Sequence, residues 1–340
     1  MKRIITFGEI MLRLNPEGYL RFTQANRFEA SYAGGEANVA VSLVNYGMNA
    51  AFVTKLPAHE IGQAAVNELR RFGVDTGSIV RGGERLGLYY VEKGASQRAS
   101  KVIYDRANSA IALAKPGEFD WKVIFKDADW FHFTGITPAL SDNSAAACME
   151  AVKTARDLGL RVSCDLNYRK KLWDSETAGR IMGGLMPFVD VCIANEEDAA
   201  DVFGIRADNS DIGKGEINRE GYISVAKQLS QRFGFSTVAI TLRGSISASD
   251  NNWSGMLYRE DKAYFAPNYA VRIVDRVGGG DSFGGALIYG FLEEYESQRL
   301  INFAAAASCL KHTIEHDFNL VSLQEVEALA AGNASGRVQR

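Results

Sequence analysis

Residues 275 to 283 place three consecutive glycines beside an acidic residue, a combination that suits phosphate chemistry. The segment reads Asp275-Arg276-Val277-Gly278-Gly279-Gly280-Asp281-Ser282-Phe283, and a helix-like run from Gly284 to Leu292 follows. Glycines let neighbouring backbone N–H groups converge, and a helix beginning there adds its positive dipole end, so the segment could cradle an anion. Asp281 would repel a resident anion, so it fits best where a hydroxyl loses its proton as a phosphoryl group arrives. The alternative is a glycine-rich loop with Asp281 as a helix cap.

The elements that would position this segment follow an alternating pattern along the chain. Apolar runs of strand length are predicted at Ile4–Phe7, Ala51–Thr54, Trp130–Thr134, Arg161–Asp165, Val189–Ala194 and Thr237–Leu242. Amphipathic helices are predicted at Glu36–Tyr46, Ile61–Phe72, Ser144–Leu158, Glu196–Phe203 and Tyr222–Phe233. This order is typical of an α/β fold with a mostly parallel central sheet covered by helices on both faces. Ligands of such sheets bind beyond the carboxyl ends of the strands.

Two segments, residues 9–33 and 86–106, depart from this pattern. They contain alternating runs such as Met11-Leu12-Arg13-Leu14 and Gly87-Leu88-Tyr89-Tyr90-Val91-Glu92, without helical periodicity. We expect them to pair as a small β-sheet lid that excludes water from the ligand site. The α/β core would then comprise residues 1–8, 34–85 and 107–330.

Composition excludes several classes of protein. Hydrophobic residues make up 46% of the 340, charged residues 23%, and the net charge is −3. There is no basic excess to favour nucleic acid or an anionic membrane as a partner, and the N-terminal apolar run is too short for a signal peptide. The four cysteines are widely spaced with no CxxC pair, which favours buried reduced thiols and a cytoplasmic location.

The absence of three known phosphate-binding motifs disfavours the protein classes that carry them. GxxxxGK[ST], the dinucleotide fingerprint and the protein-kinase motif set are all missing from the sequence. Instead, Asp275 to Asp281 and Gly34-Gly35-Glu36-Ala37-Asn38-Val39-Ala40 resemble the two signatures of the PfkB, or ribokinase-like, carbohydrate kinases. One departure is Gly279, where the family often has alanine. The resemblance covers essentially the whole chain and implies a ribokinase-like fold and ATP-dependent phosphorylation of a sugar hydroxyl.

Within that family, three segments look most like 2-keto-3-deoxygluconate kinases. They are Tyr104-Asp105-Arg106-Ala107-Asn108-Ser109-Ala110, Asp165-Leu166-Asn167-Tyr168-Arg169-Lys170-Lys171-Leu172-Trp173, and Lys311-His312-Thr313-Ile314-Glu315-His316-Asp317-Phe318-Asn319. A sugar acid carries a carboxylate, which the planar guanidinium of Arg106 can bind in a two-pronged geometry. Taken alone, an exposed arginine is usually solvated and a strand tyrosine usually packs.

The resemblance implies a role for each of the following positions. Phosphoryl transfer would use Asp281 as base and Gly278, Gly279 and Gly280 as the anion hole. The substrate would contact Gly34, Gly35, Asn38, Tyr89, Tyr104, Arg106, Arg169 and Asp317. The nucleotide would contact Asn167, Arg169, Asn195, Thr241, Arg243, Gly244, Gly278 and Gly280. Glu197 would bind Mg²⁺ through water. ATP and Mg²⁺ are the implied cofactors, with a monovalent cation as a further candidate.

Other functions stay open at this point. A fructokinase or a 5-dehydro-2-deoxygluconokinase of the same family is the nearest alternative, and Arg106 discriminates between them. A non-catalytic sugar-acid sensor conflicts with the intact Asp281 and glycine segment, and a dehydrogenase conflicts with the missing dinucleotide fingerprint. The expected partner is a small sugar acid, with no nucleic acid and no membrane. A homodimer or higher oligomer could form through an exposed edge of the lid sheet.

Overall fold

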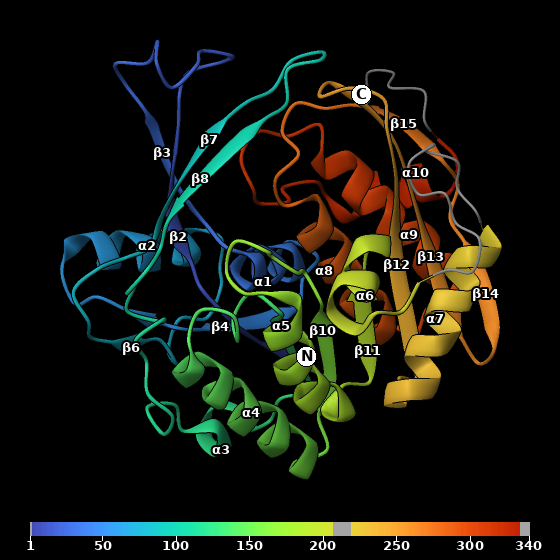
Figure 1. Ribbon diagram of the computed structural model, residues 1–340, viewed down its shortest axis with the longest axis horizontal. Coiled ribbons are helices and arrows are strands. Elements are labelled where there is room, and N and C mark those ends of the chain that lie inside the picture. Colours follow the sequence, from blue (N-terminus) through green and yellow to red (C-terminus); the bar gives the residue numbers. More distant parts are fainter. Residues whose placement is uncertain (1, 207–218, 334–340) are drawn as a thin grey trace.

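The computed structural model describes residues 2–206 and 219–333. A mostly parallel sheet of nine strands runs through the middle of this part (Figure 1). The strand order is β14-β13-β12-β11-β10-β9-β1-β4, and β15 pairs with β13. The strands are β1 (Arg3–Phe7), β4 (Asn49–Val53), β9 (Trp130–Thr134), β10 (Arg161–Asp165), β11 (Val191–Ala194), β12 (Thr237–Ser245), β13 (Asp250–Arg259), β14 (Lys262–Phe265) and β15 (Tyr269–Arg272). The predicted fold class is confirmed.

Helices cover both faces of this sheet because successive strand side chains point to opposite sides. In β11, Val191 and Ile193 join one hydrophobic core, whereas Cys192 and Ala194 join the other. The first core lies under α1 (Gly35–Asn45), α2 (Glu60–Arg71), α8 (Gly279–Leu292), α9 (Ser297–Lys311) and α10 (Leu323–Ala330). The second lies under α3 (Trp121–Ile124), α4 (Asp142–Asp157), α5 (Ser175–Leu185), α6 (Glu196–Phe203) and α7 (Arg219–Phe233). None of the described helices is long and apolar enough to span a membrane.

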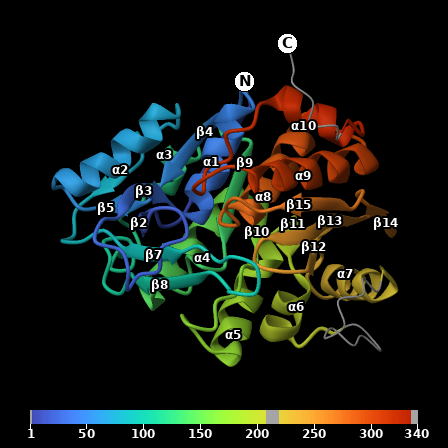
Figure 2. The ribbon, with the colours of Figure 1, turned by 90° about the horizontal axis from the view of Figure 1, so that it is seen from above.

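A separate small sheet stands to one side of the main sheet, as Figure 2 shows. Its order is β3-β2-β7-β8, with β2 (Met11–Asn15), β3 (Glu29–Ala33), β7 (Leu88–Glu92) and β8 (Lys101–Asp105). We call this the small sheet. Its strands come from the two segments predicted to pair, so their pairing is confirmed. A short parallel pair, β5 (Lys55–Leu56) and β6 (Val80–Arg81), forms a third sheet.

The hairpin strands β13, β14 and β15 extend the main sheet beyond β12 and run antiparallel to their neighbours. They were not predicted. Asparagine, aspartate and glycine, which are depleted in strands, are frequent between Asp250 and Gly255, so local propensity does not indicate a strand there. Pairing with the long strand β12 outweighs that propensity.

Candidate active site

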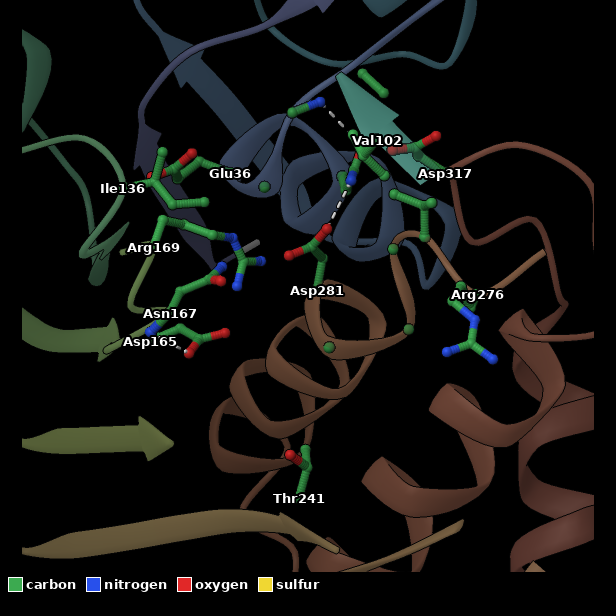
Figure 3. A pocket seen from close by; sticks show the side chains of 18 of the residues that line it. Glu36, Val102, Ile136, Asp165, Asn167, Arg169, Thr241, Arg276, Asp281 and Asp317 are labelled. Carbon is green, nitrogen blue, oxygen red and sulfur yellow. Dashed lines mark hydrogen bonds between the residues drawn. The ribbon is translucent and has the colours of Figure 1, made fainter. Parts of the chain in front are cut away.

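A cavity of about 440 Å³ lies where the carboxyl ends of the parallel strands, the start of α8 and the small sheet meet (Figure 3). This is the edge at which ligands of parallel sheets collect. The small sheet contributes Tyr89 and Tyr104, while the strand ends contribute Asp165 and Asn195. Chain segments far apart in sequence therefore share one cavity.

The glycine segment forms the floor of this cavity at the first turn of α8. Gly278 caps the helix with φ of 84°, a left-handed conformation that favours glycine, and a Cβ there would lie 2.0 Å from the carbonyl oxygen of Asp317. At Gly280 a Cβ would meet nothing within 4 Å, so this backbone borders open space. The free N–H groups of the first helical turn are therefore available to an anion.

Asp281 sits in the same turn and points toward α1 (Figure 3). Its Oδ2 accepts a hydrogen bond of 2.6 Å from Nδ2 of Asn38, which α1 supplies one turn after Gly35. Burial raises the pKa of Asp281 to about 6, while the Asn38 bond and the charge of Arg169 act in the opposite direction. A carboxylate with this pKa is ionised at pH 7 yet basic enough to accept a proton.

Arg106 and the two tyrosines form the wall that faces the cavity from the small sheet. Tyr89 and Tyr104 are directly paired across β7 and β8, and their rings stack with centroids 6.0 Å apart. Arg106 Nε donates to Oε2 of Glu9 over 2.7 Å, and Ser109 donates to the other oxygen of Glu9. The guanidinium also lies 5.3 Å from the Tyr104 ring centroid. Arg106 is therefore held at the cavity wall by an ion pair with Glu9.

Polar residues after β10 and β11 form the opposite wall. Figure 3 shows Arg169 reaching from this wall toward Asp281. Asp198 caps the backbone N–H of Tyr168 at 3.1 Å. Burial raises the pKa of Asp198 to about 6 and that of Asp165 well above its usual value, and in both cases the charge of Arg169 opposes the shift. Carboxylates beside an exposed cation suit a charged ligand.

A third side of the cavity carries Thr241, Arg243 and Arg276 together with an aromatic pair. Trp253 and His312 have ring centroids 4.6 Å apart, and the ring Nδ1 of His312 lies 2.6 Å from the Ser308 carbonyl oxygen. Burial lowers the pKa of His312 to about 4, so the imidazole is neutral. This side combines cations with flat apolar surface, as a nucleotide requires.

Asp317 lines the cavity but is already engaged by two donors. Arg13 Nη1 donates to its Oδ1 over 2.5 Å, and the Tyr89 hydroxyl donates to its Oδ2 over 2.8 Å. Arg13 Nη2 donates to Oδ2 of Asp275, also over 2.5 Å. Asp317 therefore has little capacity left for a ligand.

Oxygen donors suited to Mg²⁺ lie beside the cavity, although the described residues contain no group of three or more His, Cys, Asp or Glu side chains arranged as a tight metal site. Asp165 and Asp198 border the main cavity, whereas Glu197 borders an adjoining one of about 80 Å³ with Asn195 and Arg243. Mg²⁺ keeps several waters and uses few protein carboxylates, so this donor set fits a water-bridged ion.

Comparisons with known proteins identify the family of this chain. The pfkB family of carbohydrate kinases matches residues 1–315. The chain belongs to the PfkB family of carbohydrate kinases. It is 34% identical over 98% of both chains to the 2-dehydro-3-deoxygalactonokinase of Haloferax volcanii. A crystal structure of a 2-dehydro-3-deoxygluconokinase from Thermotoga maritima superposes with a TM-score of 0.94 at 51% identity, covering 97% of this chain and 98% of the other. A sugar kinase from Pyrococcus horikoshii solved with ATP has the same fold, with a TM-score of 0.75, 21% identity and coverage of 95% and 96%.

Most residues predicted for this kinase come together in the cavity. They are Gly34, Gly35, Asn38, Tyr89, Tyr104, Arg106, Asn167, Arg169, Asn195, Thr241, Arg243, Gly278, Gly279, Gly280, Asp281 and Asp317. Gly244 lines neither this cavity nor the adjoining one, and Glu197 lines only the latter. No role was predicted for Glu9 or Arg276, which also line the cavity. Asp198 belongs to the segment Asn195-Glu196-Glu197-Asp198, which resembles the family segment that organises Mg²⁺ and phosphate, and it lines the cavity as well.

Proposed function

We propose that this kinase transfers the γ-phosphoryl group of ATP to the primary hydroxyl of a sugar acid, with 2-keto-3-deoxygluconate as its substrate. The observation that carries the proposal is that Asp281, the glycine floor and Arg106 of the facing wall all line one cavity. The named activities of the relatives from Haloferax volcanii and Thermotoga maritima support the same substrate class.

The mechanism follows from the positions of these groups. The substrate hydroxyl would lie beside Asp281, which accepts its proton as the oxygen attacks the γ-phosphorus in line with the leaving ADP oxygen. The hydrogen bond from Asn38 orients the carboxylate. Backbone N–H groups at Gly279 and Gly280, together with the α8 dipole, stabilise the charge on the equatorial phosphoryl oxygens. No covalent enzyme intermediate is required.

Nucleotide and metal would occupy the remaining walls. We assign the nucleotide to the third side of the cavity, with the polyphosphate nearest Arg243 and the glycine floor and the base and ribose against Trp253 and His312. Asp198, Asp165 and Glu197 would hold Mg²⁺ through water. When bound, Mg²⁺ neutralises the charge on the β- and γ-phosphate oxygens.

Arg106 would bind the substrate carboxylate. Its Nε and Nη2 face Glu9, which leaves the Nη1 edge available to a ligand. The Glu9 pair fixes the guanidinium plane, so little side-chain entropy is lost when the ligand binds. The stacked hydroxyl-bearing rings of Tyr89 and Tyr104 would cover the sugar as part of a lid formed by residues 9–33 and 86–106.

The experiment that tests the substrate class is a kinetic comparison of Arg106→Ala and Arg106→Lys with the wild type. Arg106→Ala should raise KM for 2-keto-3-deoxygluconate about 10- to 100-fold, since a charge-assisted hydrogen bond contributes roughly 1.5 to 3 kcal/mol. KM for ATP should change little. Arg106→Lys should restore only part of the loss, because an ammonium cannot reproduce the fork.

Arg85→Ala is the matched control, because Arg85 forms an exposed ion pair with Asp105 on the same small sheet outside the cavity. It should leave both KM values unchanged. If fructose is the better wild-type substrate and Arg106→Ala is harmless to the sugar acid, the sugar-acid assignment fails and the fructokinase alternative replaces it.

Two minor parts of the proposal concern cations and location. We infer that a monovalent cation contributes little, because buried Arg13 and Lys311 already place positive charge near Asp275 and Asp317. Replacing K⁺ by choline should leave kcat within about twofold, and a larger loss would assign a cation site.

The four free cysteines are buried, which supports the expected cytoplasmic location.

A further inference from the structure

We propose that Arg13 is a positioning residue that couples the small sheet to the glycine floor, so that the floor keeps its catalytic geometry only while the small sheet is seated on it. The proposal rests on the kinase function proposed above. Arg13 itself does not line the cavity, so it acts through other residues.

Burial of Arg13 is the first observation. Its side chain is 0% exposed, and it belongs to the buried face of β2 with Met11 and Asn15, whereas Leu12 and Leu14 are only half-buried. A buried arginine on the face of a strand is expensive unless both prongs are paired. Here both prongs are paired, and with carboxylates from outside the small sheet.

Those two carboxylates belong to the two segments that shape the floor. Asp275 accepts from Arg13 with one oxygen and from the backbone N–H of Val277 with the other, at 3.1 Å, which fixes the turn that leads into Gly278. Asp317 accepts from Arg13, and its backbone carbonyl packs directly against Gly278. One guanidinium from the small sheet thus holds both supports of Gly278.

Lys311 and Tyr89 complete this buried cluster. Lys311 is 0% exposed, donates to the Ile314 carbonyl oxygen over 3.3 Å, and lies near enough to Asp275 and Asp317 for their charges to act on it. The cluster therefore brings two basic side chains, Arg13 and Lys311, together with two acidic ones, Asp275 and Asp317. Tyr89 donates to Asp317 from the cavity wall, so a ligand touching Tyr89 contacts the same network.

The structure thus differs from one in which the small sheet merely covers the ligand. Pivoting of β2 away from the core would pull Arg13 from both aspartates and leave two buried carboxylates with reduced compensation beside Gly278. Repulsion between them and a phosphate would then weaken the floor. The position of the small sheet and the geometry of the glycine floor are therefore coupled through Arg13.

The test compares Arg13→Ala, Arg13→Lys and a matched control, Arg98→Ala. Arg98 lies in the connection between β7 and β8 and pairs with Glu92 at the end of β7. It is absent from the cavity lining, and its removal leaves Glu92 paired to Arg21. For each protein, kcat and KM are measured with Mg·ATP and the best wild-type substrate. Binding of a non-hydrolysable ATP analogue is measured by calorimetry, and folding by circular dichroism.

We expect Arg13→Ala to lower kcat about 10²-fold, with a smaller change in KM for the sugar, because a displaced floor misaligns the phosphoryl group. The analogue should bind about fivefold more weakly. Millimolar guanidinium ion should restore part of the kcat of Arg13→Ala by filling the vacated site between the two carboxylates. Arg98→Ala should resemble the wild type.

If Arg13→Ala does not fold, Arg13→Lys tests whether Arg13 couples the small sheet to the glycine floor. It keeps the buried charge, yet one ammonium cannot bridge two carboxylates as the fork does, so kcat should fall at least about tenfold. Wild-type kcat in folded Arg13→Lys, or in folded Arg13→Ala, would overturn the coupling role while leaving the proposed function intact. Conversely, if the wild type prefers a neutral sugar, the proposed substrate fails and the Arg13 series is measured on that sugar.

Discussion

In the proposed mechanism, the environment of Asp281 selects this carboxylate for proton transfer. It combines a raised pKa of about 6, a short hydrogen bond from Asn38 and a position at the first turn of α8. Asp317 lines the same cavity, but its two carboxylate oxygens already accept hydrogen bonds from Arg13 and Tyr89. The same residue type therefore serves two purposes within one cavity.

Replacing this base should separate activity from stability. Asp281→Asn should lower kcat by at least ~10²-fold while ATP binding changes little, since the amide keeps the shape but cannot accept the proton. Because burial disfavours the ionised form, the folded-state pKa lies above the unfolded value. The stabilising contribution of Asp281 is therefore present below its unfolded pKa and lost as the pH rises through about 6.

Thermal melts of the two proteins at a series of pH values check the stability side. Asp281→Asn should melt at a higher temperature than the wild type at pH 8, and the difference should vanish near pH 4. Retention of more than about a tenth of the wild-type kcat in this variant would remove Asp281 from the base role.

A pH profile of the wild-type enzyme tests the same group without mutation. The base must be ionised to accept a proton, so kcat/KM should fall about tenfold per unit as the pH drops below about 6. The Asp198 carboxyl also has a raised pKa of about 6, so the profile is repeated with Asp198→Asn. If the acidic limb disappears in that variant, it reports Asp198 and not Asp281.

At the scale of elements, the first turn of α8 contains one glycine that the fold requires and one that it does not. Gly280 is helical and faces open space, so the backbone does not require a glycine there, and we propose that its missing side chain leaves room for the ligand. Gly278 has a positive φ and touches the Asp317 carbonyl, so it is required by the fold.

Two glycine substitutions should therefore give opposite results. Gly280→Val should lower kcat/KM for ATP at least ~10²-fold while the melting temperature stays within about 2 °C, because the side chain enters only the phosphate space. Gly278→Ala should lower the melting temperature, since the backbone strain alone costs ~1 to 3 kcal/mol and the clash adds to it. Normal turnover by folded Gly280→Val would place the anion hole elsewhere.

An element could be predicted from the sequence when neighbouring residues determine it, but not when partners far away in the chain do. Strands β9 and β10 match their apolar runs residue for residue, because burial on both faces leaves a continuous signal. The buried face of β2 could not be predicted, because Arg13 is buried through partners more than 250 residues away. Glu9 escaped notice for a similar reason, since its partner Arg106 is 97 residues distant.

At the scale of the whole molecule, the small sheet has two edges that carry apolar side chains. Strands β3 and β8 each pair on one side only, and Ile103 on β8 is 53% exposed, with Phe28 beside β3 at 41%. Unpaired edges with exposed apolar residues favour association. We therefore predict a homodimer or higher oligomer in solution, built on these edges.

Light scattering coupled to size exclusion measures this directly. Ile103→Lys should shift the assembly toward monomer, whereas Leu113→Lys should not, because Leu113 is equally exposed at 51% but lies outside the small sheet. A monomeric wild-type protein would contradict the prediction.

The most direct test of the central claim is ADP release by the wild-type enzyme with Mg·ATP and a panel of acceptors: 2-keto-3-deoxygluconate, its galactonate epimer, 5-dehydro-2-deoxygluconate and fructose. Asp281→Asn serves as the blank for adventitious hydrolysis. We predict the highest kcat/KM for a 2-keto-3-deoxy sugar acid, at least ~10-fold above fructose, as expected from one charge-assisted contact of ~1.5 kcal/mol or more through Arg106. A higher kcat/KM for fructose, or ADP release that Asp281→Asn retains, would contradict the account.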